Sequence, residues 1–91
     1  MALTKETVVD KIEVLEMGQV QVRTATRVKE DGVELSSSFH RHVIEPSTKA
    51  SGSWADTDIS GEDARVQAVA NATWTNSVKT AYQEMIDAQT P

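Results

Sequence analysis

The dipeptide Asp31-Gly32 stands between two segments in which apolar and polar residues alternate. A two-residue type I′ turn requires positive φ at both central positions, and Asp-Gly is among the sequences that tolerate this best. The preceding segment, QVQVRTATRVK, places Val20, Val22 and Val28 on one side, as expected of a strand with one buried face. The sequence therefore predicts a β-hairpin with its tip at Asp31 and Gly32.

Counting outward from this tip predicts which residues of the two strands face each other. The predicted partners are Glu30 with Val33, Val28 with Leu35, Thr24 with Phe39, and Val20 with Val43. In this register the apolar residues of both strands share one face, and Lys29 faces Glu34, a favourable cross-strand pair. His40 and His42 then lie on the opposite, polar face of the sheet.

A second hairpin is predicted before the first one. Matching Ile12 and Val14 with the valines of the central strand leaves a three-residue loop, EMG, that ends at Gly18. Loops of this length usually end with a left-handed residue, which glycine adopts without strain. We therefore expect a three-stranded antiparallel meander over residues 7–44.

The remainder of the chain divides into a loop and a helical segment. Residues 46–60 show no periodicity and are rich in Ser, Thr, Asp, Gly and Pro, which is typical of a surface loop. Within it, Trp54 is expected either to tie the loop to the core or to contact a partner. Residues 61–88 carry apolar positions at helical spacing, with Ser60 as the expected N-cap.

The apolar positions before and after Thr73 point in different directions around a helix. The sequence therefore predicts helices over 61–73 and 76–88, with Thr75 as the cap of the second, although one bent helix is the alternative. Residues 89–91 are expected to form a tail. The predicted fold is α+β: a single domain over 1–91, in which a helix or kinked helix pair packs on one face of the meander.

Composition limits how such a domain can be stabilised and what it can bind. The chain has 91 residues, four aromatic residues and no cysteine, so its core is small and has no disulfide or cysteine-bound zinc to support it. Association with another copy or with a larger assembly would bury more surface. The net charge of -5 argues against a dedicated nucleic-acid binder. No apolar stretch resembles a membrane span or a secretory signal.

The two histidines are the first residues to consider as a chemical site. His40 and His42 lie two positions apart on a predicted strand, so they share a face at a spacing of about 7 Å. Zinc needs a third protein ligand, and the nearest candidate is Glu13, two strands away. A metal-dependent enzyme is therefore the least favoured function. We predict no catalytic residue, no cofactor and no small-molecule substrate.

The polar side of the sheet is the candidate binding face. Its cationic and imidazole groups, together with Trp54 from the loop, form the predicted site: Arg23, Arg27, Lys29, His40, His42 and Trp54. Sheets that bind nucleic acids usually add exposed aromatic side chains for base stacking, and none is predicted on this face. Arg41 falls among the apolar residues in the predicted register. We expect it to pair with a helix carboxylate from Glu62, Asp63, Glu84 or Asp87.

Over nearly its full length the chain resembles a group of small proteins of marine tailed bacteriophages. The resemblance rests on KIEV at 11–14, QVRTAT at 21–26, EDG at 30–32, SFHRHV at 38–43, SGEDARVQAVAN at 60–71 and WTNSVK at 74–79. Members of this group have no established activity, so the resemblance assigns no site. It implies a phage gene product located in the host cytoplasm or the phage particle.

The expected function is therefore that of a non-enzymatic accessory or assembly protein of a phage, acting through protein-protein association. Its expected partner is another copy of the chain or a phage or host protein. The alternative is a binding module in which the polar sheet face contacts nucleic acid or a host protein.

Overall fold

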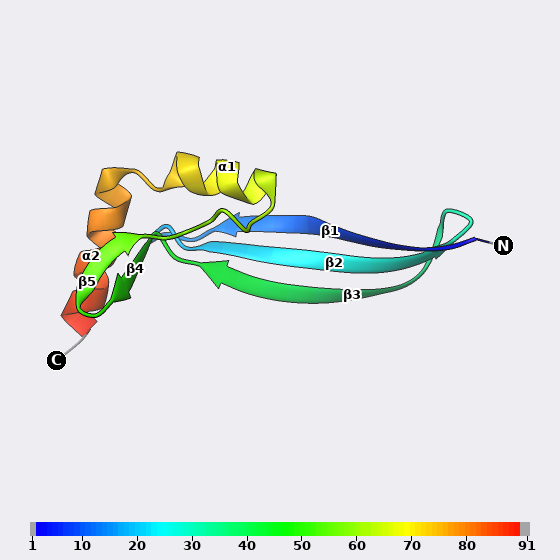
Figure 1. Ribbon diagram of the computed structural model, residues 1–91, viewed down its shortest axis with the longest axis horizontal. Coiled ribbons are helices and arrows are strands. Elements are labelled where there is room, and N and C mark those ends of the chain that lie inside the picture. Colours follow the sequence, from blue (N-terminus) through cyan, green and yellow to red (C-terminus); the bar gives the residue numbers. More distant parts are fainter. Residues whose placement is uncertain (1, 90–91) are drawn as a thin grey trace.

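Three long strands form an antiparallel meander in the computed structural model, which describes residues 2–89 (Figure 1). The strands are β1 (Leu3–Val14), β2 (Val20–Glu30) and β3 (Val33–Ile44), with β2 in the middle. A separate hairpin of β4 (Ser47–Ala50) and β5 (Ser53–Asp56) follows, and then helices α1 (Ala64–Thr73) and α2 (Asn76–Gln89). The predicted α+β fold is confirmed. The expected tail over 89–91 is wrong at Gln89, which is the last residue of α2, and residues 90 and 91 lie outside the described residues.

Both predicted turns of the meander are present. Asp31 and Gly32 have φ values of 51° and 84°, as the tip of the β2–β3 hairpin requires. In the β1–β2 turn, the Leu15 N–H donates to the Gln19 carbonyl oxygen at 2.8 Å, and Gly18 has a φ of 90°. The three-residue loop that ends at Gly18 is therefore confirmed.

The predicted register of β2 against β3 is wrong beyond the first two pairs. Lys29 faces Glu34 as expected, but Leu35 is an extra residue on β3, and Val28 then faces Ser36. Because strand side chains alternate between faces, this shift of one residue exchanges the two faces for the remainder of β3. Its partners from there on include Thr24 with His40, Val22 with His42, and Val20 with Ile44.

The shift places His40 and His42 on the face that α1 covers, which corrects the prediction that they lie on the polar face. Phe39 and Val43 move to the opposite face, where they are 50% and 51% exposed. In exchange, Ile44 packs against the buried core. The carboxyl end of β3 thus contributes Ile44, and not Val43, to the core.

A second bulge, on β1, brings two apolar residues to the same face. Val9 faces Thr24 and Lys11 faces Arg23, so Asp10 is the extra residue between them. Val9 and Ile12 both pack against the core, although they are three positions apart. The bulge resolves this odd spacing and leaves Asp10 free to contact Arg23.

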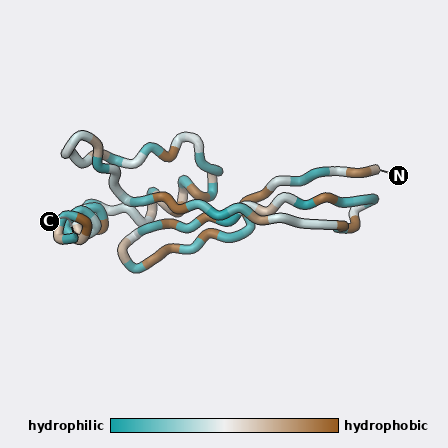
Figure 2. The backbone as a smooth tube through the Cα atoms, turned by 90° about the horizontal axis from the view of Figure 1, so that it is seen from below, coloured by the Kyte–Doolittle hydropathy of each residue, from teal (hydrophilic) through white to brown (hydrophobic). Residues whose placement is uncertain are grey.

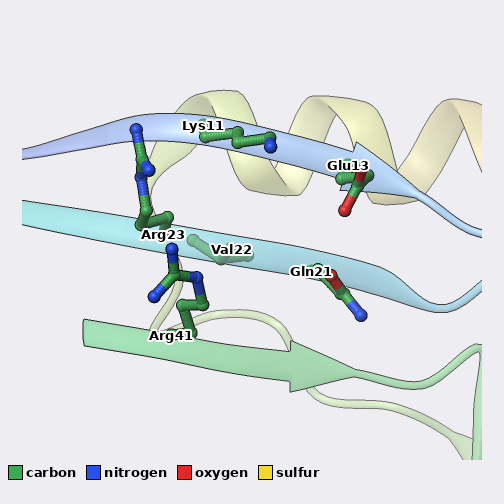
Figure 3. Close-up of a pocket in the computed structure, with 6 residues that line it drawn as sticks. All are labelled: Lys11, Glu13, Gln21, Val22, Arg23 and Arg41. Atoms are coloured by element: carbon green, nitrogen blue, oxygen red, sulfur yellow. The ribbon is translucent and has the colours of Figure 1, made fainter. Parts of the chain in front are cut away.

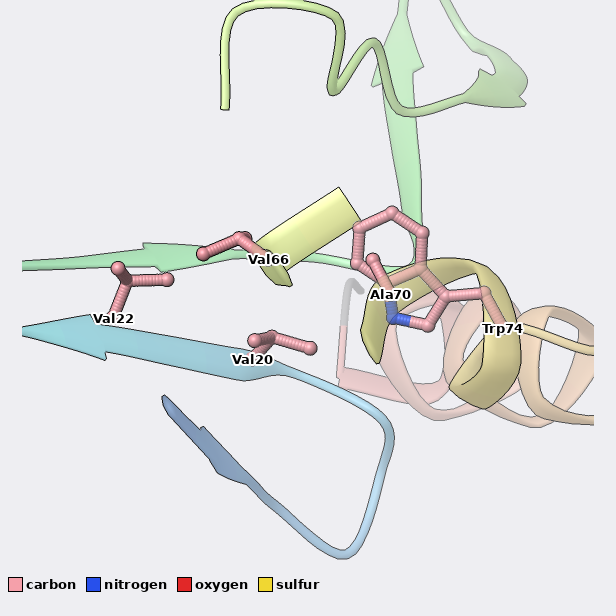
Figure 4. Close-up of a cluster of buried hydrophobic side chains, with 5 residues drawn as sticks. All are labelled: Val20, Val22, Val66, Ala70 and Trp74. Carbon is pink, nitrogen blue, oxygen red and sulfur yellow. The ribbon is translucent and has the colours of Figure 1, made fainter. Parts of the chain in front are cut away.

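The core lies at one end of the sheet, under α1. Its buried residues come from β2, from α1 and from the residue after α1: Val20, Val22, Val66, Ala70 and Trp74 (Figure 4). The molecule measures 58 × 26 × 23 Å, and the strands extend well beyond α1 (Figures 1 and 2). In this uncovered part Leu3, Val33 and Leu35 are 64%, 65% and 57% exposed. The expected packing of helices on one face is therefore limited to one end of it.

Trp74 joins the helices to the β1–β2 turn. Its Nε1 donates to the Gly18 carbonyl oxygen at 2.7 Å, and its side chain is buried. Loss of such a bond leaves a buried carbonyl without a partner, which costs about 1–3 kcal/mol. A Cβ on Gly18 would lie 2.5 Å from Val78 Cγ1 and 3.0 Å from Pro46 Cγ. Only glycine therefore fits where the turn meets α2.

The two helices are separate, as the sequence predicts. The Val78 N–H donates to Thr75 Oγ1 at 3.3 Å, so Thr75 caps α2. The predicted start of α1 is wrong, because Asp63 rather than Ser60 is the N-cap and accepts from the Arg65 N–H at 2.9 Å. Asp58 accepts the Ser60 N–H at 3.0 Å, which holds residues 60–61 in a turn before the helix.

The expected loop over 46–60 contains the β4–β5 hairpin. Its tip is Ser51-Gly52, with φ values of 51° and 80°, so a turn sequence of the same class as Asp31-Gly32 was overlooked. Trp54 on β5 meets the Tyr82 ring edge to face at 6.0 Å, and its Nε1 donates to Asp87 Oδ2 at 3.3 Å. The expectation that Trp54 ties this segment to the fold is confirmed, and its anchor is α2.

Gly18→Ala is expected to destabilise the protein more than Gly32→Ala does. Both substitutions strain a positive φ, but only the Cβ at position 18 meets other atoms, since nothing lies within 4 Å of position 32. We expect a loss of about 2–4 kcal/mol for Gly18→Ala and of about 1 kcal/mol for Gly32→Ala. Urea unfolding followed by tryptophan fluorescence measures both values, and equal losses would contradict the packing described for Gly18.

Tyr82, the single tyrosine, is expected to titrate abnormally. Burial, together with a hydrogen bond to the Glu45 carboxylate, raises its pKa to about 12. Because the folded pKa lies above the ordinary value of about 10, this contribution to stability is complete below pH 10 and is lost as the pH rises through 12. Absorbance at 295 nm against pH should show a midpoint near 12 in buffer and near 10 in urea. A midpoint near 10 in both would show that Tyr82 is not buried.

Candidate interaction surface

The residues of the predicted binding face lie on three separate surfaces. Arg23 and Arg27 lie on the face of the sheet that α1 leaves bare, here called the outer face, and Lys29 pairs beside them. His40 and His42 lie on the other face, and Trp54 lies on the β4–β5 hairpin. The bulge at Leu35 places the histidines and the arginines on opposite faces of the sheet, so these residues cannot bind one ligand together.

Three of the outer-face cations, Arg23, Arg27 and Lys29, are neutralised by carboxylates from the strands on either side. Arg23 makes a bidentate contact with Asp10, at 2.9 Å from Nε and 2.8 Å from Nη2. Arg27 lies 3.4 Å from Glu34 and 3.7 Å from Glu6, and Lys29 lies 3.1 Å from Glu6. This arrangement holds the three strands together and neutralises these three cations.

Asp10 is the most sheltered acid of this network, with 13% of its side chain exposed. The hydrogen bonds from the Arg23 guanidinium hold the pKa of the Asp10 carboxyl below its usual value, against the opposing effect of burial. The bidentate pair thus favours the ionised carboxylate in the folded state.

Next to this network is a shallow hollow of about 40 Å³ (Figure 3). It is lined by Lys11, Glu13, Gln21, Val22, Arg23 and Arg41, which come from all three strands. A volume of this size has room for a few water molecules or a small ion. Its lining contains three cations, of which Arg23 is already paired with Asp10, and one carboxylate, that of Glu13.

Arg41 and Phe39 complete the outer face. The Arg23 guanidinium carbon lies 4.5 Å from the centre of the Phe39 ring, a cation-π contact. Arg41 faces Arg23, and its side chain has no hydrogen bond or ion pair with any residue in the range 2–89. The prediction that a helix carboxylate pairs with Arg41 is wrong, because the shifted register turns Arg41 away from the helices.

The histidines form a small cluster on the side of α1. His42 Nε2 lies 2.8 Å from Glu62 Oε1, and the His40 ring stacks on His42 with centres 6.3 Å apart. This contact joins β3 to the turn that precedes α1. Glu13 pairs with Gln21 on the outer face, so the three residues considered as zinc ligands are not together. Within residues 2–89, no three potential ligand side chains are grouped so as to hold a metal.

Trp54 has its contacts inside the fold. Its indole N–H and Lys49 Nζ both reach Asp87, the latter at 2.9 Å, and Lys49 also lies 5.5 Å from the centre of the Trp54 ring. The hydrogen bonds from Lys49 and Trp54 lower the pKa of Asp87. These contacts join the β4–β5 hairpin to α2.

Sequence reasoning missed β3 as an exposed surface. Four of its large apolar side chains are half exposed or more: Val33, Leu35, Phe39 and Val43. The alternation of β3 alone did not reveal this, because its apolar residues match those of β2 in the register without a bulge. The triplet of serines before Phe39 was the available signal, since small polar residues are unusual on a strand that is buried on one side.

The sequence matches no protein-family model, and no curated protein or solved structure is significantly similar to it. The resemblance to phage proteins therefore stays a prediction. In the part of the chain that the structure describes, neither helix has the length and apolar character needed to cross a membrane.

Replacing Asp10 with asparagine is expected to make the free energy of unfolding depend less on pH in the acidic range. The lowered pKa means that Asp10 stabilises the folded state above its ordinary pKa of about 4, and that this effect is lost as the pH falls through the folded pKa. Asp10→Asn should therefore reduce stability at pH 7 and weaken its dependence on pH below 5. Urea unfolding at a series of pH values measures this.

Glu13→Gln is the matched control, since Glu13 lies on the same face and strand with no ion pair among the described residues. We expect its stability to follow the wild-type pH dependence. If Asp10→Asn also follows the wild-type curve, the Arg23–Asp10 pair does not stabilise the sheet.

Proposed function

We propose that this chain is a non-enzymatic accessory or assembly protein that acts through protein-protein association. The observation that supports it is the exposed apolar surface of β3 in the half of the sheet that no helix covers. The resemblance stated above adds that the assembly is that of a tailed bacteriophage. Under this proposal, the sheet is a projecting arm and the helical end is its folded base.

In an isolated monomer, apolar side chains of the arm remain exposed to water. Side chains such as Val33 and Leu35 remain 65% and 57% exposed, whereas their full burial would stabilise the protein by about 1.5–3 kcal/mol each. Large exposed apolar patches on a protein usually mark a contact with another protein. A partner that covers the arm would supply the burial that the small core lacks.

Nucleic-acid binding through the outer face is less well supported. Binding to phosphates depends on cations that release counterions, but Arg23, Arg27 and Lys29 already pair with carboxylates of the same sheet. The net charge of -5 opposes the approach of a polyanion as well. We therefore favour a protein partner over a nucleic acid.

A catalytic role is not part of this proposal. General acid-base catalysis needs a base placed in a pocket beside its substrate. His42 contacts Glu62 at the side of α1, and the hollow of the outer face lies on the other side of the sheet. The two features do not form one site.

Light scattering after size exclusion, at two widely separated concentrations, tests association with another copy. We expect a mass above that of the 9.9 kDa monomer, increasing with concentration. The double substitution Leu35→Thr and Val43→Thr should weaken association with little loss of stability, because both side chains are half exposed or more in the monomer.

Leu3→Thr is the control, because Leu3 is 64% exposed on β1 at the opposite edge. Association that responds equally to both changes would contradict the role of β3. Two results together would contradict the proposed function. The chain would stay monomeric, and the wild type and the double variant would retain the same proteins from a host lysate.

A further inference from the structure

The two edges of the sheet differ in how well they are protected against pairing with another strand. On β1, Arg65 of α1 donates to the Val9 carbonyl oxygen, so part of the outward backbone already has a partner. The bulge at Asp10 and the side chains of Lys5 and Lys11 interrupt this edge further. Bulges and lysines are among the devices that prevent one edge strand from pairing with another.

The β3 edge has none of these features over most of its length. From Ser36 to Ile44 the strand pairs with β2 without a bulge and contains neither proline nor lysine. Among residues 2–89, no element pairs with its outer side, and Figure 1 shows β3 as an open edge. Ser36, Ser37 and Ser38 have small side chains, which allow close approach of another backbone. An unprotected edge of this length is a template for a further strand.

The charges of β3 complement each other when the strand is turned end to end. Arg41, on the outer face, has no ionic partner within residues 2–89, and Glu34 is half exposed with its carboxylate toward the same face, beside Arg27. In an antiparallel pair centred on Ser38, Arg41 of one copy faces the Leu35 bulge of the other. Glu34 is then its diagonal neighbour, within reach of long side chains. Two-fold symmetry forms this contact twice.

We propose that a second copy of this chain pairs its β3 antiparallel to β3 of the first. Ser38 faces Ser38 at the two-fold axis, and Arg41 of each copy pairs with Glu34 of the other. The two meanders then form one continuous six-stranded sheet, with the helical bases at opposite ends. This inference rests on the proposed function, because it names the partner and the strand through which the chain associates.

Ser38→Lys tests the position of the interface. Two lysines would face each other at the axis, and like charges directly opposite destabilise a strand pair. Light scattering should show a monomer at concentrations where the wild type is a dimer, while circular dichroism remains unchanged. Thr7→Lys, at an exposed position on the β1 edge, is the matched control and should remain a dimer.

A charge exchange tests the register. Arg41→Glu and Glu34→Lys should each raise the dissociation constant of the dimer by about tenfold or more, since each places like charges across the axis twice. The double variant Arg41→Glu, Glu34→Lys reverses both partners and should regain most of the affinity. Sedimentation equilibrium measures the three constants.

Three outcomes would overturn the inference. A double variant no tighter than the single ones excludes the Arg41–Glu34 register, and an equal response to Ser38→Lys and Thr7→Lys excludes the β3 edge. A wild type that is monomeric at every concentration excludes a second copy as the partner. In each case the proposed function stands if the chain still captures another protein through its apolar β3 side chains, so the two failures are distinguishable.

Discussion

The single extra residue at Leu35 determines what each side of β3 contacts. Strand side chains alternate strictly, so an insertion of one residue exchanges the two faces beyond it. Through it, Ile44 reaches the core, His42 reaches Glu62, and Arg41 faces Arg23 on the bare side of the sheet. The bulge at Asp10 does the same on β1, where it brings Val9 into the core and turns Asp10 toward Arg23.

These two bulges determine which side chains lie on each face of the sheet. On the side of α1, valines pack around Trp74, whose indole N–H binds the Gly18 carbonyl and so joins the helices to the first turn. On the outer side, arginines and a lysine alternate with carboxylates from the neighbouring strands. The outer face is stabilised by charge pairs within the sheet, and this is why it does not resemble a surface for binding phosphates.

The helices cover only one end of the sheet. α1 has ten residues, and α2 packs against the β4–β5 hairpin through Trp54 and Tyr82 and meets the meander at the β1–β2 turn through Val78. The far half of the three strands therefore carries apolar side chains that the chain itself does not bury. A second strand along β3 would extend the sheet at its unprotected edge. It would bury surface of the arm and so add to the burial that the small core of the base provides.

Local signals in the sequence determined the elements of this protein. Asp31-Gly32 and Gly18 specify the two turns because few residues adopt positive φ, and Thr75 separates the helices because its hydroxyl caps the second one. Ser51-Gly52 is a signal of the same kind, and it forms a hairpin tip in the segment that the sequence predicts to be a loop. Only the tertiary structure decided the faces of β3 and the surroundings of His40, His42 and Arg41. The register predicted from the sequence matches Val28 and Val20 with apolar residues, whereas in the structure Val28 faces Ser36 and Val22 faces His42. The observed register is accompanied by contacts with Glu62, the core and Phe39 that lie far apart in the sequence.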